Sequence, residues 1–95
     1  MMKTTPEQVR KLLKKHKLPY GLNKAEGFWY VYGGDTIHWD HTNIMVTNFY
    51  DRPPEYWLDL IIGMHDQNKS RIDLDQADDE TKAAYVAVEN YKRSL

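Results

Sequence analysis

A run of five aromatic and β-branched side chains, Phe28-Trp29-Tyr30-Val31-Tyr32, constrains the fold of this chain more than any other feature. Residues of these types favour β-strands, where large side chains pack on a pleated surface. Gly33-Gly34-Asp35 follows at once and supplies the positive φ values that a tight hairpin turn needs. We therefore expect a strand at 28–32 that turns back at 33–35.

Two more strands are predicted beyond this turn. Residues 36–39 form a short second strand, 40–43 are a turn rich in Asp and Asn, and 44–49 form a third strand. Residues 27–50 are thus predicted to be a three-stranded antiparallel meander.

A first helix is predicted over about 6–17. Thr5 and Gln8 give the Thr-x-x-Gln pattern of a capping box, and Pro6 occupies the first helical position, which proline tolerates. Pro19 and Gly21 are expected to end the helix, with Gly21 in a left-handed turn. The inward stripe of this helix is formed by Val9, Leu12, Leu13 and His16.

Two more helices follow the strands. The segment 51–55, with Asp51 as N-cap, starts a helix that runs to about Met64 or His65, and a polar loop separates it from a last helix over about 79–92. Their inward stripes are Trp57, Leu58, Ile61 and Ile62, and then Ala84, Val88 and Tyr91. The order α-β-β-β-α-α predicts an α+β fold with an antiparallel sheet.

The length of 95 residues predicts a single domain over 1–95, with a core of about 5–65 and a C-terminal loop and helix at 66–95. The chain has no cysteine, which excludes disulfides and thiolate metal sites and is typical of a reducing compartment. The sequence has no apolar run of about 18 residues, and residues 1–6 lack the apolar stretch of a signal peptide, so neither a membrane span nor a signal peptide is expected. A cytoplasmic protein without membrane contact is expected.

The residues that could carry chemistry do not form a recognisable catalytic or metal-binding pattern. On a strand, His38 and Asp40 share a face while His41 falls in a turn, so these side chains and His65 are not expected to converge on a metal. Asp35 and Asp40 lie at predicted hairpin ends, where aspartate is common for turn geometry alone. We therefore expect no enzymatic activity and no cofactor.

The predicted sheet has one face suited to a core and a second face with more aromatic surface than solvent contact explains. The second face carries Phe28, Tyr30, Tyr32, His38, Met45, Thr47 and Phe49. It could be covered by the last helix, bind another protein, or stack nucleic-acid bases.

Charge is divided unevenly along the chain. Residues 1–27 hold seven Lys and Arg against two Glu, whereas 28–95 hold six basic against twelve acidic residues. The exposed basic residues of the first helix, Arg10, Lys11, Lys14 and Lys15, could contact phosphates of RNA. The acidic remainder of the chain weighs against that role.

Two family resemblances bear on function. The element order and the segment Glu7-Gln8-Val9-Arg10-Lys11-Leu12-Leu13-Lys14-Lys15-His16 resemble the double-stranded-RNA-binding-type fold of HicA toxins, which implies a small ribonuclease. The Gly-Ser-His segment of that family is replaced here by Glu26-Gly27-Phe28-Trp29, so no catalytic residue is carried over. The residue pattern of 27–35 and 55–58 is similar to that of small bacteriophage and prophage proteins, which implies an inhibitor of a host defence or nucleic-acid-processing complex.

These observations predict a non-enzymatic module that docks on another macromolecule and modulates it. The expected partner is a protein or a protein complex. The predicted partner-binding residues are Tyr30, Tyr32, His38 and Phe49. One alternative is an RNA-binding or degenerate HicA-like ribonuclease domain that uses Arg10, Lys11, Lys14 and Lys15. Another is a structural or dimerisation subunit that associates through its alanine-rich last helix.

Overall fold

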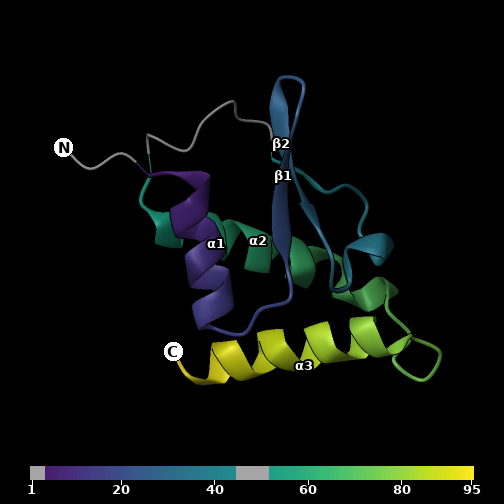
Figure 1. The fold of residues 1–95 in the computed structure, drawn as a ribbon. Helices are drawn as coiled ribbons and strands as arrows, with labels where there is room; N and C mark the ends of the chain where they lie inside the picture. The colour runs from purple at the N-terminus through teal and green to yellow at the C-terminus, as the bar shows by residue number, and fades with distance from the viewer. Residues whose placement is uncertain (1–3, 45–51) are drawn as a thin grey trace.

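The computed structural model describes residues 4–44 and 52–95 and confirms the predicted α+β class and order of elements (Figure 1). One helix precedes a three-stranded antiparallel sheet, and two helices follow it. The elements are α1 (Pro6–Lys15), β1 (Gly21–Ala25), β2 (Phe28–Tyr32), the 3-10 turn η1 (Thr36–His38), β3 (Asn43–Ile44), α2 (Pro54–Asn68), the 3-10 turn η2 (Lys69–Arg71) and α3 (Asp79–Arg93).

The strands on either side of β2 differ from the prediction. β2 has the predicted bounds, but it pairs with β1, a segment that its composition does not mark as a strand. Ala25 pairs with Phe28, so the hairpin turn lies at Glu26-Gly27, where Gly27 has a φ of 84°. The hairpin turn predicted at residues 33–35 is therefore wrong, because β2 forms its hairpin with β1 and pairs on its other edge with β3, not with residues 36–39.

Gly33 and Gly34 do adopt positive φ values, 85° and 56°, but they lead the chain out of the sheet into η1. The strand predicted at residues 36–39 is wrong. Asp35 is buried and accepts a hydrogen bond from Trp39 Nε1, four residues on, which holds this segment in a tight turn. The third strand is confirmed at Ile44, and residues 45–49 lie outside the described residues.

The helix ends follow from local chemistry. The Thr5 side chain accepts from the Gln8 N–H and the Gln8 side chain accepts from the Thr5 N–H, so the predicted capping box is confirmed. α1 ends two residues earlier than expected. The left-handed residue after it is Lys17, with a φ of 58°, rather than Gly21, which belongs to β1.

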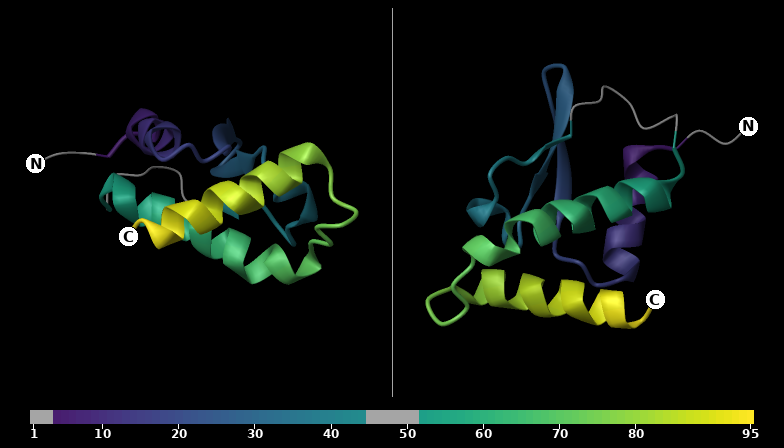
Figure 2. Two further views of the ribbon diagram at one scale, coloured as in Figure 1. Left: turned by 90° about the horizontal axis from the view of Figure 1, so that it is seen from below. Right: turned by 180° about the vertical axis from the view of Figure 1, so that it is seen from behind.

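α2 and α3 run antiparallel and are joined by ion pairs (Figures 1 and 2). Lys92 Nζ lies 2.8 Å from Asp66 Oδ1, and Lys69 Nζ lies 3.8 Å from Glu89 Oε1. α2 extends to Asn68, beyond its predicted end, and its N-cap is Pro53; the predicted N-cap Asp51 lies outside the described residues. α3 has the predicted start and ends one residue later, at Arg93.

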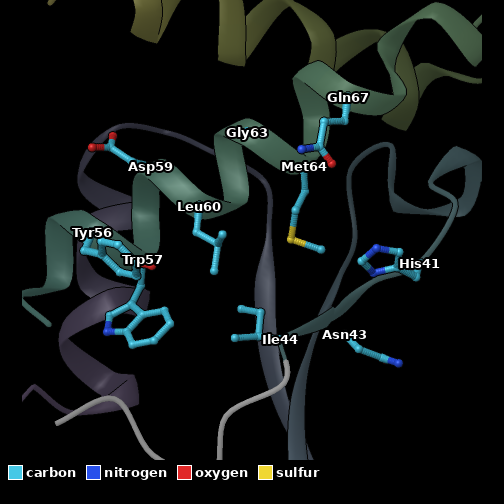
Figure 3. Close-up of a pocket in the computed structure, with 10 residues that line it drawn as sticks. All are labelled: His41, Asn43, Ile44, Tyr56, Trp57, Asp59, Leu60, Gly63, Met64 and Gln67. Atoms are coloured by element: carbon cyan, nitrogen blue, oxygen red, sulfur yellow. The ribbon is translucent and has the colours of Figure 1, made fainter. Parts of the chain in front are cut away.

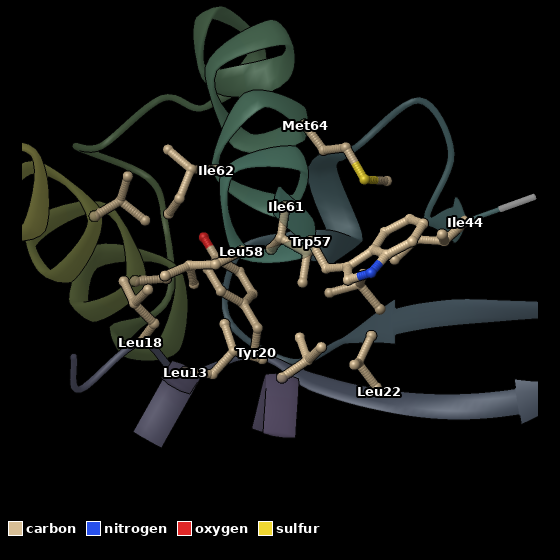
Figure 4. Packing of buried hydrophobic residues seen from close by; sticks show 14 of the residues in the cluster. Leu13, Leu18, Tyr20, Leu22, Ile44, Trp57, Leu58, Ile61, Ile62 and Met64 are labelled. Atoms are coloured by element: carbon tan, nitrogen blue, oxygen red, sulfur yellow. The ribbon is translucent and has the colours of Figure 1, made fainter. Parts of the chain in front are cut away.

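A single cluster of buried side chains joins the sheet to all three helices (Figure 4). The inward face of the sheet contributes Leu22, Val31 and Ile44. The predicted stripes of α2 and α3 are all buried, and Val9 and Leu13 are the buried residues of α1. α3 lies beneath the open end of the hairpin, whose turn projects away from the helices (Figure 1). Within the described ranges, no helix has the length and hydropathy to cross a membrane.

Candidate functional site

A groove of about 480 Å³ lies between β3 and α2 (Figure 3). Both elements contribute apolar side chains to it, and Figure 3 shows Leu60 and Met64 pointing from α2 toward Ile44 on β3. The lining residues are His41, Asn43, Ile44, Tyr56, Trp57, Asp59, Leu60, Gly63, Met64 and Gln67.

The floor of the groove is buried, whereas its helical wall is open to solvent. Ile44, Trp57 and Met64 are buried members of the core. Tyr56 and Leu60 remain 43% and 36% exposed. The groove therefore offers large apolar side chains at the surface on a rigid support, which is the usual composition of a binding cleft.

Gly63 deepens the groove in the middle of α2. A β-carbon added there would meet no heavy atom of the described residues within 4 Å, so these residues leave the space above it open. Glycine inside a helix is less stable than alanine by about 0.5–1 kcal/mol, since it has more conformational freedom to lose. Packing in the described structure does not require this glycine, but close approach of a bound chain would.

β3 forms one edge of the described sheet, beside the groove. The Val31 N–H donates to the Thr42 carbonyl oxygen at 2.9 Å. Bonded and non-bonded pairs alternate along antiparallel strands, so Asn43, which pairs with Tyr30, directs its own N–H and C=O to the outer edge. An extended peptide in the groove would find a backbone donor and acceptor there.

The predicted partner-binding residues lie in different places. Tyr30 and Tyr32 share the outward face of β2, as expected, and Tyr32 is 48% exposed, so α3 does not cover this face completely. Both rings also stabilise the hairpin, because Tyr30 Oη accepts from Asn23 Nδ2 at 3.3 Å and Tyr32 lies over Gly21. Their role in binding stays a prediction.

His38 does not lie on the sheet with the two tyrosines. It belongs to η1, so its predicted place on a strand face is wrong, and the cause is the turn around Asp35. Phe49 lies outside the described residues.

The basic residues of α1 divide into two groups. Arg10 is occupied: it pairs with Glu7, donates to the Leu22 carbonyl oxygen at 2.8 Å and lies 5.8 Å from the Trp29 ring centroid. Lys11, Lys14 and Lys15 are exposed and have no ion pair within the described residues. Arg10 therefore attaches α1 to the hairpin, and three lysines remain available to an anionic partner.

A buried polar cluster surrounds Asp35, which the sequence indicated only as a turn residue. Tyr20 Oη donates to Asp35 Oδ1 at 2.5 Å, and Trp39 Nε1 donates to Oδ2 at 2.9 Å. His65 Nδ1 lies 2.7 Å from the same Oδ2, and because a carboxylate only accepts, the ring proton belongs on Nδ1. Asp35 does lie in a turn, as predicted, but turn geometry alone does not account for it, because its carboxylate joins the start of β1, η1 and α2.

Burial and hydrogen bonding act in opposite directions on this carboxylate. Burial alone would raise the pKa of Asp35, but hydrogen bonds from His65, Tyr20 and Trp39, together with the His65 charge, lower it below its ordinary value. Burial and the Asp35 carboxylate raise the pKa of the Tyr20 hydroxyl. The cluster is therefore most stable with Asp35 ionised and Tyr20 protonated.

The His65–Asp35 pair has the arrangement of a catalytic dyad but is closed to substrate. Both side chains are 0% exposed, and His65 Nε2, the atom that would face a nucleophile in a dyad, has no hydrogen-bond partner among the residues that the structure describes. Among the described residues, no three His, Asp or Glu side chains gather as a metal site.

The sequence contains one signal for the groove, a pair of apolar residues on α2 that lie outside the stripe predicted to face the core. Tyr56 and Leu60 stand at i and i+4 on α2, outside the buried stripe of Trp57, Leu58 and Ile61. When a helix carries apolar residues outside the stripe that faces the core, those residues form a second apolar surface that the core does not cover. The partner of that surface, Ile44, comes from a distant strand, so the groove itself could not be predicted.

Comparison with family models, with curated proteins and with solved structures finds no match for this chain.

Proposed function

We propose that this protein is a non-enzymatic binding module that docks on a partner protein through the groove between β3 and α2. The observation that supports the proposal is the open apolar groove over Gly63, with Tyr56 and Leu60 exposed along its wall. Apolar side chains at the surface of a small domain favour a binding role over a purely structural one.

The geometry favours an extended segment of the partner. The outward peptide groups of Asn43 can hydrogen-bond to a strand laid beside β3, and alternate side chains of that strand would enter the space over Gly63. The enclosed His65–Asp35 pair supports binding rather than catalysis. A module that blocks a host complex, as the resemblance to phage proteins implies, is one form that this function could take.

A displayed library of random peptides tests the proposal with the purified protein as bait. Wild type should enrich peptides that carry apolar residues at alternate positions, because successive side chains of a strand point to opposite faces. Gly63→Ala should be more stable by about 0.5–1 kcal/mol and yet retain these peptides less, since its methyl group occupies the groove. Leu60→Glu should lose them.

The control is Leu74→Glu, a matched change of leucine to glutamate at a residue that is 39% exposed, between η2 and α3 and outside this groove. It should select the same peptides as wild type. A library that yields no enriched peptides, or yields the same peptides with Gly63→Ala and Leu60→Glu, would refute the groove as the docking site.

A further inference from the structure

A second groove, of about 560 Å³, lies between the end of α1 and the outer side of α3. Its floor consists of Ala83, Val86 and Ala87, and Val86 is 57% exposed. The complete lining is His16, Lys17, Lys82, Ala83, Val86, Ala87 and Asn90. It shares no residue with the groove between β3 and α2.

The two sides of α3 differ in whether their lysines form ion pairs with carboxylates. On the side that faces α2, Lys92 pairs with Asp66 and with Glu89. On the groove side, Lys17 and Lys82 flank the apolar floor, the lining contains no carboxylate, and neither lysine has an ion pair within the described residues. The groove therefore combines an apolar floor with unneutralised positive charge.

Lys17 also occupies a backbone conformation that favours glycine. Its φ of 58° lies in the left-handed region, at the position after the α1 C-cap where glycine is usual. A lysine there costs conformational free energy that glycine would not. An unfavourable conformation is often kept where the side chain has a use, and this side chain lies at the groove.

We propose that this second groove docks an acidic amphipathic helix of a partner protein. Ala83, Val86, Ala87 and Asn90 follow helical spacing, and the two alanines allow another helix to approach closely. Glutamates at the edges of that helix would neutralise Lys17 and Lys82 while its apolar stripe covers Val86. RNA fits less well, since the floor of alanine and valine offers bases neither hydrogen-bond partners nor a stacking ring.

Fluorescence anisotropy with a synthetic peptide tests the proposal. The probe is a labelled helix of about 16 residues with leucine at i, i+3, i+4 and i+7 and glutamate elsewhere. Wild type should bind it with a Kd on the order of 10–100 μM, more weakly when salt is raised from about 50 to about 300 mM. The same peptide with lysine in place of glutamate should not bind.

Two substitutions separate docking from folding. Lys17→Gly should raise Tm by a few degrees, because glycine adopts the left-handed conformation without strain. The same substitution should weaken binding of the acidic peptide about three- to tenfold. Val86→Glu should change Tm little and abolish binding, since its charge repels the peptide. Lys24→Glu, the same type of exposed cation on β1 outside the groove, is the control and should bind within about twofold of wild type.

Several results would overturn the proposal. These are no saturable binding of the acidic peptide, equal binding of the lysine peptide, or unchanged affinity in both Lys17→Gly and Val86→Glu. Tighter binding of an RNA hairpin that the same two substitutions abolish would assign the groove to nucleic acid instead.

Discussion

The cluster around Asp35 and the groove between β3 and α2 are opposite in chemistry and in exposure. The cluster is polar and buried: Asp35 and His65 are completely enclosed, and the carboxylate accepts from Tyr20, Trp39 and His65. The groove is apolar and open, with Tyr56 and Leu60 exposed along its wall.

The difference separates the part of the molecule that holds the fold from the part that can bind. A buried carboxylate with several donors fixes three segments in one arrangement, because none of the donors can leave without exposing an unsatisfied group. The exposed side chains of the groove wall lie outside the buried core cluster: the Tyr56 ring contacts the Trp57 ring and the Arg52 guanidinium, and Leu60 is not a member of the cluster. Substitutions should therefore affect stability in the cluster and binding in the groove.

The largest effect is expected from removing the Asp35 carboxylate. Asp35→Ala leaves the Tyr20 hydroxyl, the Trp39 N–H and the His65 N–H without their acceptor, at a cost of about 3–5 kcal/mol. Urea unfolding followed by tryptophan fluorescence measures it. Asp75→Ala, an exposed aspartate, should stay within about 0.5 kcal/mol of wild type. Equal stability of the two variants would mean that the cluster does not hold the fold.

A smaller effect is expected at acid pH. The pKa of Asp35 is lower in the folded than in the unfolded protein, so its contribution to stability is complete above its ordinary pKa of 3.8. That contribution is lost as the pH falls through the folded value, and Asp66, whose pKa is also lowered, adds to the loss. Urea midpoints should fall below about pH 4, and Asp35→Asn should fall less steeply than wild type. Identical slopes would contradict this.

Tyr20→Phe should cost about 1.5–3 kcal/mol, the usual value of a hydrogen bond to a charged acceptor. The phenyl ring keeps its packing against Trp39, 5.5 Å between centroids, so the loss reports the hydroxyl alone. Thermal unfolding by circular dichroism measures it. A variant as stable as wild type would show that water or another group replaces the tyrosine.

The smallest effect on stability is expected in the groove. Leu60→Glu changes an exposed side chain and should alter the free energy of unfolding by no more than about 0.5 kcal/mol. Leu58→Ala, two residues earlier on α2 and 1% exposed, should cost about 2–5 kcal/mol. Urea unfolding of the pair measures both, and a large loss in Leu60→Glu would place that side chain in the core and remove the contrast between the two regions.

The helices could be predicted because their signals are local. The Thr5–Gln8 capping box, the start of α3 at Asp79 and the inward stripes of α2 and α3 all lie within a few residues of the structure they specify. Helix bonds join near neighbours in the chain, so composition and spacing determine them.

The sheet could be predicted as a class but not in its pairing. The run 28–32 is a strand by composition, yet whether it pairs with 21–25 or with 36–39 depends on contacts between segments. Gly33 and Gly34 have the backbone geometry of a hairpin turn, and nothing local shows that the turn is used to bury Asp35 instead.

The sequence by itself determined the α+β class, the three helices and the strand at 28–32. Tertiary structure decided the first strand, the burial of Asp35 against His65, and both grooves. Asp35 and His65 are 30 residues apart in the chain, and each groove is lined by residues from different elements. The physical reason is that burial and strand pairing are free energies of the whole assembly, whereas a helix stripe and its cap are properties of one segment.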